Sequence, residues 1–544
     1  MSDNRKQNYL HGAAILTAGV VIMKILGAIY KIPLGNILGD EGYGYFLTAY
    51  NIYNIFLTLA TAGLPVALSR MISEANTLKR PMQARRTFKV ALATFAVVGI
   101  VGTVIMYLLP TELAIAMNSP KSAQSIFALA PAVLLCCLLS AYRGYCQGHS
   151  NMIPTTVGQV LEVIVKVIVG VALALIFTRQ RRSLPECSSG AIFGVTAGSL
   201  AAMLYMLWYK RRNYVDGPVE NPDTPAPHLS IVKDLLIIGI PITLGASVMS
   251  LISLIDNKLV LYQLQMAAGF SQQEADVLWG VYGKAMTLYN LPASFITPLT
   301  ISVVPSIAAC VASKRHIEGC EIGENSLRIA SVICMPMGVG LAVLSTPIMK
   351  LVYPSAHGSG GRLLMFMGIA SVLVCLALMS NAILQAHGNE RYPIISVIAG
   401  GAAKIAVNWT LVGNPDINIV GAPIGTICCY GVMCLFNYIF LCRCMERRPR
   451  LSKTLLRPVL SCAVMGAAAW GLYGLLEMCL SGVISFGIGR LSAGWIVTAI
   501  SAIGAIGAAV TVYLVMAISM RAVTLEDMKL IPRGEKIAKL LHIR

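Results

Sequence analysis

The sequence predicts an all-α integral membrane protein with fourteen spanning helices, and three observations predict it. Hydrophobic residues make up 56% of the 544 residues, and charged residues make up only 12%. That charged fraction is about half that of typical soluble domains. The mean hydropathy is +0.73. Apolar runs of about 20 residues, which is the length that crosses a bilayer as a helix, recur along the whole chain.

Fourteen apolar runs are long enough to span. The first follows a short, polar and basic N-terminus, and it is too long for the core of a cleavable signal peptide. We therefore interpret it as the first spanning helix. The predicted spans are 13–34, 45–70, 87–109, 123–145, 155–178, 189–209, 231–256, 277–309, 325–349, 362–386, 393–412, 419–441, 455–477 and 492–519.

The positions of lysine and arginine predict the orientation, because these residues concentrate in cytoplasmic loops. With the N-terminus in the cytoplasm, most of the 42 basic residues fall in cytoplasmic segments. An even number of spans then places the C-terminus in the cytoplasm as well. One loop departs from the pattern, because Arg179, Arg181 and Arg182 would face outward. We interpret the net charge of +18 as attraction to anionic membrane lipids, and we expect no nucleic-acid partner.

A polar connection at 210–230, rich in proline and acidic residues, predicts a cytoplasmic linker. It separates a first lobe at 1–209, with spans one to six, from a second lobe at 231–445, with spans seven to twelve. Residues 446–544 hold the last two spans and a basic tail. The expected domain order is therefore lobe, linker, lobe and a final helix pair.

The two lobes carry an internal repeat. Four polar identities recur at one offset of 238 residues, which is rare by chance in so apolar a chain. Because each lobe has an even number of spans, the repeat is of the parallel type, and two such lobes with a cavity between them favour alternating access. The matching pairs are Gln147 and Gln385, His149 and His387, Asn151 and Asn389, and Lys166 and Lys404.

Charges inside the predicted spans are the strongest functional signal. Lys24, Glu162, Lys166 and Lys404 each cost about 2.5–3.5 kcal/mol at the bilayer centre. Glu162 and Lys166 are four residues apart on one helix face. They form either a self-neutralised structural pair or a coupling site at which Glu162 exchanges a proton or a cation. Lys24 and Lys404 either face a shared cavity or are neutralised locally by pairing or snorkelling.

Further polar residues lie on spans one, two, seven and eight. The basic excess there predicts an anionic solute, because lysines act as point charges for phosphate groups. We expect Lys31, Lys284, Asn51 and Asn290 to line the central cavity with Lys24 and Lys404. We expect Asp256 and Lys258 to contribute to an outer gate.

The sequence predicts neither an enzyme nor a bound cofactor. It contains no phosphate-binding loop of an ATPase and no protease or esterase signature. Cys442 and Cys444 form a lone C-x-C pair, so we expect no metal site. A membrane-embedded transferase of polyprenyl-linked sugars remains an alternative of another class. Its acidic residues would come from the predicted outer connection at 256–277.

The chain resembles the multidrug/oligosaccharidyl-lipid/polysaccharide exporter superfamily. The resemblance is carried by residues 15–75, including Leu38-Gly39 and the G-L-P of Gly63–Pro65, and by the Q-x-x-x-N of Gln147–Asn151. It is most similar to the branch of stage V sporulation protein B and the polysaccharide biosynthesis proteins, relatives of the MurJ lipid II flippases. The fourteen spans, the six-plus-six lobes and the added last pair also fit this superfamily.

The resemblance implies a flippase for polyprenyl-pyrophosphate-linked precursors of cell wall, such as peptidoglycan, or of polysaccharide, in the plasma membrane of a bacterium. A monomer is the working expectation. It also implies that the last two spans border a groove for the lipid tail. MurJ-type flippases keep arginines in the cavity, whereas this sequence has Lys24, Tyr30, Lys31 and Lys284 in that region. A cation-coupled multidrug exporter of the same superfamily is the alternative, with Glu162 as its acidic residue.

Overall fold

The computed structural model describes residues 23, 26–27, 29–213, 223–446, 451–484 and 490–520. Lys24, most of the first predicted span, much of the linker and the basic tail lie outside the described residues. Residues 29–37 are helical. The further elements are α2 (Gly39–Thr61), α3 (Leu64–Thr77), α4 (Pro81–Leu108), α5 (Pro110–Ala116), η1 (Pro120–Ser122), α6 (Ala123–Gly148), α7 (Ile153–Arg179), α8 (Leu184–Asn213), α9 (His228–Met266), α10 (Gln272–Ala312), α11 (His316–Val343), α12 (Ser345–Val352), α13 (Gly360–Ala386), α14 (Arg391–Val412), η2 (Asn418–Val420), α15 (Gly421–Cys444), α16 (Leu451–Ile484) and α17 (Arg490–Ser519).

The predicted all-α membrane class is confirmed. Within the described ranges, thirteen helical segments are long and apolar enough to cross a bilayer, and they correspond to the second to fourteenth predicted spans. The helices α2 and α3 together form the first of these segments. The count of fourteen stays a prediction, because the first predicted span falls mostly outside what the structure describes.

The predicted outer connection at 256–277 is largely helical, which corrects its expected length. The helix α9 continues to Met266 and α10 starts at Gln272, so the connection contains only residues 267–271. A span that is predicted from a run of apolar residues ends where the first polar residues occur. Here Asp256, Asn257 and Gln263 are buried within the fold, and the helix continues through them.

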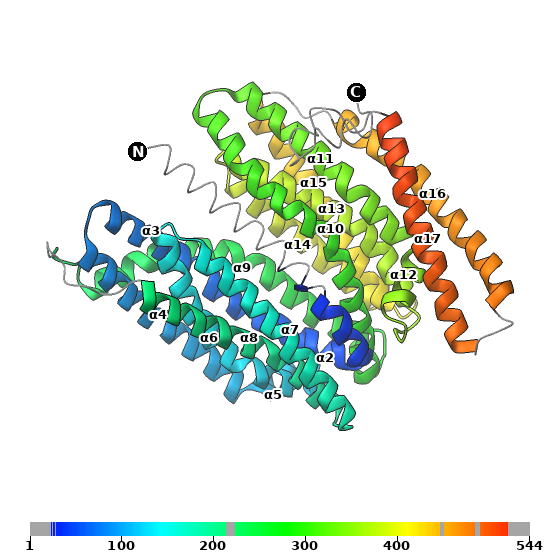
Figure 1. The fold of residues 1–544 in the computed structure, drawn as a ribbon, viewed down its shortest axis with the longest axis horizontal. Helices are drawn as coiled ribbons and strands as arrows, with labels where there is room; N and C mark the ends of the chain where they lie inside the picture. The colour runs from blue at the N-terminus through cyan, green and yellow to red at the C-terminus, as the bar shows by residue number, and fades with distance from the viewer. Residues whose placement is uncertain are drawn as a thin grey trace. The chain divides into compact units, whose positions relative to one another are not determined.

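The chain forms two compact units, Met1–Gly280 and Val281–Arg544, and their border lies within α10. In the first unit, α9 packs against α2, α3 and α4 (Figure 1). A Cβ added to Gly63 would overlap the carbonyl oxygen of Gly239, so glycine is needed where α9 crosses the α2–α3 junction. The helix after the linker thus belongs to the first unit, while the predicted lobe borders stay a prediction.

Asp223, within the predicted linker at 210–230, caps the N-terminus of α4. Its carboxylate accepts hydrogen bonds from the backbone N–H groups of Met82 at 2.8 Å and Gln83 at 3.0 Å. These N–H groups lie in the first turn of α4, where no intrahelical acceptor exists. Desolvation raises the pKa of Asp223, but the hydrogen bonds outweigh it and lower the pKa. Asp223 is therefore ionised and docked on α4 at neutral pH.

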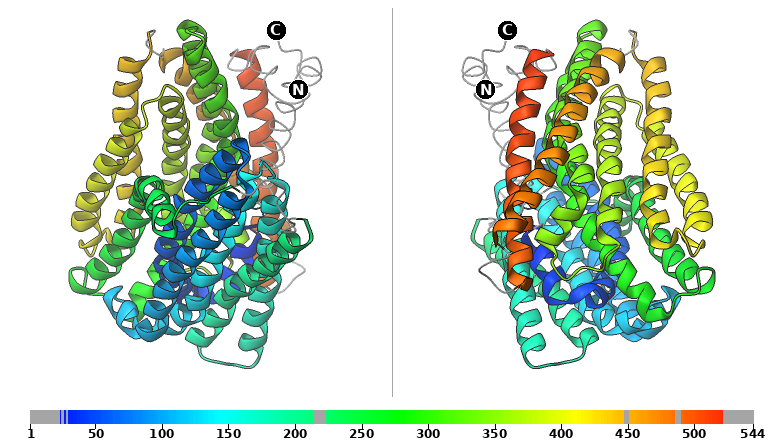
Figure 2. Two further views of the ribbon diagram at one scale, coloured as in Figure 1. Left: turned by 90° about the vertical axis from the view of Figure 1, so that its left-hand side faces the viewer. Right: turned by 90° about the vertical axis from the view of Figure 1, so that its right-hand side faces the viewer.

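In the second unit, the last two helices form a packed pair. The helix α16 runs beside α17 and packs on α11, while α17 also contacts α12 (Figure 2). The Tyr513 hydroxyl of α17 donates to the carbonyl oxygen of Val332 in α11 at 2.7 Å. Buried side chains such as Cys462, Met465 and Tyr513 join this pair to the core of the unit.

The internal repeat recurs as one turn geometry in both units. The helix α6 ends at Gly148 and α13 ends at Ala386, again 238 residues apart. The residue two positions later has positive φ in both copies, 58° at Ser150 and 78° at Gly388, as in helix ends that close with a left-handed residue. The equivalent hydrogen bonds are Asn151 N–H to Cys146 O at 3.0 Å and Asn389 N–H to Leu384 O at 3.1 Å.

Candidate functional site

The site is built on a close crossing of α7 and α8 in the first unit. A Cβ added to Gly194 would lie 2.6 Å from the carbonyl oxygen of Lys166, and one added to Gly198 would overlap that of Glu162. Small residues spaced four apart allow such backbone approach in membrane helices. The crossing places Ser199 of α8 beside the Glu162 carboxylate.

Glu162 is paired with Arg143 of α6. Arg143 Nη2 donates to Glu162 Oε2 at 2.7 Å, and Ser199 Oγ donates to Glu162 Oε1 at 3.2 Å. The two charged side chains are 14% and 21% exposed. The pair is therefore largely shielded from solvent but not sealed. The Glu162 carboxylate is therefore paired with Arg143 on another helix, and not with Lys166 on its own helix.

Two lysines lie over tyrosine rings near this ion pair. Lys166 Nζ is 5.3 Å from the centroid of the Tyr30 ring, and Lys31 Nζ is 5.7 Å from that of Tyr50. The Tyr30 hydroxyl donates to the carbonyl oxygen of Ala191 at 2.9 Å, which fixes the ring on α8. Cation–π contacts of this kind stabilise a lysine without neutralising its charge.

These residues form one connected polar cluster. The Tyr50 ring, over which Lys31 lies, packs against the Tyr53 ring of α2 at 5.9 Å between centroids. The Tyr53 hydroxyl is hydrogen-bonded to Cys136 Sγ of α6 at 2.9 Å, and Cys136 Sγ to Ser199 Oγ at 3.4 Å. We call Lys31, Arg143, Glu162, Lys166 and Ser199 the α7 cluster. Arg143 and Lys166 together exceed Glu162 by one positive charge, on side chains that are half-buried. Such a site attracts an anion.

Arg143 keeps unused donor capacity. Its Nε atom is shielded from solvent and has no hydrogen-bond partner within the described part of the chain. The same holds for Oε1 of Gln159, one turn before Glu162 on α7. Buried polar atoms are nearly always hydrogen-bonded in folded proteins. The Arg143 guanidinium therefore has a donor that the contact with Glu162 does not use.

The second unit keeps the lysine of this cluster and lacks its ion pair. At the repeat offset of 238 residues, Lys166 corresponds to Lys404, Arg143 to Asn381 and Glu162 to Gly400. Asn381 accepts a hydrogen bond from Asn437 Nδ2 at 2.9 Å. The second unit therefore has a neutral amide, Asn381, at the position equivalent to Arg143. The ion pair is a special feature of the first unit.

The structure places the predicted cavity residues in different environments. In the first unit, Lys31 and Asn51 are half-buried. In the second unit, Lys404 is half-buried, and Lys284 is completely buried with its Nζ 5.4 Å from the Tyr353 ring centroid. Asn290 is exposed and donates to the Met286 carbonyl oxygen at 2.7 Å. A shared cavity for these residues stays a prediction.

Sequence reasoning missed Arg143 and Ser199. The available signal is that Arg143 lies inside the predicted span at 123–145, where an arginine costs as much as the lysines inside the other spans. For Ser199 no signal exists, because serine is common in membrane helices and its role comes only from the α7–α8 crossing.

The predicted outer end of the first unit holds a second polar contact. Asp276, in the first turns of α10, is fully buried and accepts a hydrogen bond from Ser119 Oγ at 2.7 Å. Glu41 of α2 pairs with Lys121 at 3.2 Å. A Cβ added to Gly280 would overlap the carbonyl oxygen of Asp40, so α2 and α10 touch here through glycine.

The predicted gate residues Asp256 and Lys258 lie on α9. Asp256 is buried, at 5% exposure, and Lys258 is exposed. Their gating role stays a prediction.

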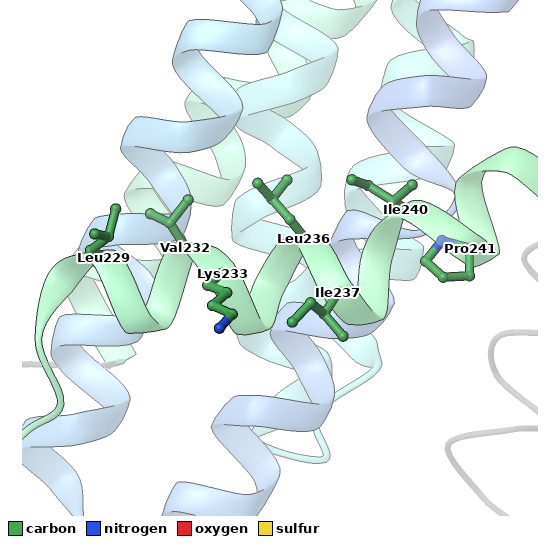
Figure 3. Close-up of a pocket in the computed structure, with 7 residues that line it drawn as sticks. All are labelled: Leu229, Val232, Lys233, Leu236, Ile237, Ile240 and Pro241. Atoms are coloured by element: carbon green, nitrogen blue, oxygen red, sulfur yellow. The ribbon is translucent and has the colours of Figure 1, made fainter.

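A pocket of about 650 Å³ lies along the first half of α9. Figure 3 shows apolar side chains around it, with Lys233 as its charged member. It offers one cation, whereas the α7 cluster offers three, so we do not place head-group binding there. The described residues contain no group of three histidine, cysteine or acidic side chains that could hold a metal.

Residues 9–311 match the family model described as polysaccharide biosynthesis protein. The chain belongs to this family. Three relatives from Bacillus subtilis (strain 168) match over nearly their whole length. The uncharacterized membrane protein YabM is 28% identical over 98% of this chain and 96% of its own. The lipid II flippase MurJ is 27% identical over 91% and 93%. The stage V sporulation protein B is 23% identical over 97% and 98%.

Two solved structures show the same fold. One is the lipid II flippase MurJ in an inward closed conformation, with a TM-score of 0.65, 13% identity, and coverage of 93% of this chain and 99% of that one. The other is an inward-facing multidrug resistance MATE family transporter of the MOP superfamily, with a TM-score of 0.63, 16% identity, and coverage of 79% and 98%. The family and fold expected from residues 15–75 are therefore confirmed.

Proposed function

We propose that this polysaccharide biosynthesis family member is an alternating-access flippase for polyprenyl-pyrophosphate-linked cell-wall or polysaccharide precursors of the lipid II type. It works in the plasma membrane of a bacterium with both termini in the cytoplasm, and it forms no covalent intermediate. The observation that carries this proposal is the α7 cluster. The excess of positive charge of Arg143 and Lys166 over Glu162 inside a membrane helix bundle fits a substrate with a charged phosphate head group.

The cluster supplies what a pyrophosphate needs. Arg143 presents a planar guanidinium that can hold two oxygens at once, and Lys31 and Lys166 add point charges. The proposed cavity also contains Lys24, Lys284, Lys404, Asn51 and Asn290. The tail would remain in the bilayer beside α16 and α17, and the lobes would rock to expose the head group outside.

The ion pair does not favour a cation-coupled drug exporter. A carboxylate that exchanges cations must be free to release them, whereas both oxygens of Glu162 are held by Arg143 and Ser199. The short 267–271 connection likewise gives no support to a sugar transferase with an acidic outer loop.

A growth assay tests the proposal. The chain is expressed in cells whose essential lipid II flippase can be switched off, beside Lys31→Gln and the exposed control Arg315→Gln. We expect the wild type and Arg315→Gln to restore growth and Lys31→Gln to fail at equal membrane levels. Failure of the wild type at a normal membrane level would exclude lipid II as the substrate.

A further inference from the structure

We propose that Glu162 holds Arg143 in the place of the substrate's pyrophosphate, and that substrate binding transfers Glu162 from Arg143 to Lys166. This inference rests on the proposed function, because it names the residues that exchange partners when the head group enters. In the structure, Arg143 binds Glu162 and Lys166 lies over Tyr30. In the loaded protein, Arg143 binds the pyrophosphate and Lys166 binds Glu162.

Arg143 is suited to receive the anion. It contacts a single carboxylate oxygen through Nη2, and its Nε has no hydrogen-bond partner among the residues described. A pyrophosphate can engage two guanidinium nitrogens with parallel hydrogen bonds, which the present pair does not do. At 14% exposure the side chain remains reachable.

Lys166 is suited to receive the carboxylate. It follows Glu162 by four residues on α7, and glutamate before lysine at this spacing is the favourable order for an ion pair within a helix. Its described contact is the Tyr30 ring, which is held in place by the hydrogen bond to Ala191. A lysine in a cation–π contact keeps its full charge and can swing to a carboxylate.

The exchange avoids the main cost of opening a buried ion pair. Removing one partner leaves an uncompensated charge in a poorly hydrated region, which is strongly unfavourable. With a transfer to Lys166, the Glu162 carboxylate is paired before and after binding, and Arg143 exchanges the carboxylate for the pyrophosphate. Arg143 is therefore released only when an anion can replace the carboxylate.

The second unit supports a dedicated role for the pair. There the lysine is kept as Lys404, while Asn381 and Gly400 stand where the arginine and the glutamate would be. A lysine at this position therefore does not require a neighbouring glutamate. The Arg143–Glu162 pair therefore serves a role that is specific to the first unit.

The test measures inorganic pyrophosphate binding to the purified full-length protein in nanodiscs by calorimetry. We expect Glu162→Gln to bind about tenfold more tightly than the wild type, which corresponds to about 1.4 kcal/mol, because the competing carboxylate is gone. We expect Arg143→Gln to lose binding. Glu41→Gln removes a different carboxylate of the first unit, which pairs with Lys121, and should leave affinity unchanged.

A double-mutant cycle separates the transfer from direct contact. If Lys166 acts by receiving Glu162, Lys166→Gln weakens binding severalfold in the wild type and has no effect in Glu162→Gln. Equal weakening in both backgrounds would show that Lys166 touches the anion itself and would overturn the transfer. Monodisperse elution of each variant shows that it is folded. Arg143→Lys, which keeps the positive charge, is measured beside Arg143→Gln as a milder change at the same position.

The remaining outcomes are also decisive. Unchanged or weaker binding in Glu162→Gln, or no pyrophosphate binding by the wild type, would overturn the inference. Lipid transfer is measured separately on the same wild-type preparation. If the binding pattern holds and no polyprenyl-pyrophosphate lipid is moved, the partner exchange stands and the proposed function fails.

Discussion

The replacement of Arg143 by glutamine tests how much the ion pair stabilises the first unit. The 2.7 Å contact between Arg143 Nη2 and Glu162 Oε2 is a charge-assisted hydrogen bond, a class that contributes about 1.5–3 kcal/mol. The residual exposure of 14% and 21% allows some screening by water. We therefore expect a coupling free energy near the lower end, about 2 kcal/mol.

The assay is a double-mutant cycle on the free energy of unfolding in detergent micelles. Each single variant, Arg143→Gln or Glu162→Gln, leaves one charge without its partner, whereas the double variant removes both. The double variant should therefore be more stable than the sum of the two single effects predicts. Effects that add to within about 0.5 kcal/mol, as for independent sites, would refute the reasoning.

Three more predictions follow from the geometry. Gly198→Ala should lower the melting temperature by several degrees, because its Cβ would overlap the Glu162 carbonyl oxygen, while Gly507→Ala on α17, with no neighbour within 4 Å, should not. Gly280→Ala should separate α2 from α10 and speed amide hydrogen exchange at 276–280; unchanged exchange would contradict the glycine contact. Asp223→Asn should speed exchange of the Met82 and Gln83 amides. Because the folded pKa of Asp223 is lowered, its docking is present at neutral pH and is lost only as the pH falls below its usual value of about 3.9. Protection that persists in Asp223→Asn would contradict this role.

The helices could be predicted because apolar runs of bilayer length leave the backbone no alternative to internal hydrogen bonding. The predicted span ends were less accurate. The helix α9 runs ten residues beyond its predicted end at 256, and α10 starts five residues before 277. Polar residues such as Asn257 continue a helix when the protein buries them, and hydropathy alone does not reveal that burial.

The ion pair could not be predicted, because partner choice between helices depends on tertiary packing. From the sequence, the only cation at helical spacing from Glu162 was Lys166. The actual partner, Arg143, lies on α6 and is 19 residues away. It meets Glu162 only because α6 and α7 both pack against α8. The repeat was predictable in contrast, because Gln147, His149 and Asn151 share one local turn with their later copies.

The most direct test of the central claim is transfer of a fluorescent polyprenyl-pyrophosphate-linked disaccharide across proteoliposomes that contain only this protein. We predict that the wild type exposes the head group to an outer quencher faster than empty liposomes do. Glu41→Gln should match the wild type, and Arg143→Gln should match empty liposomes. Equal rates for the wild type and empty liposomes, or full transfer by Arg143→Gln, would contradict a flippase that holds its substrate through the α7 cluster.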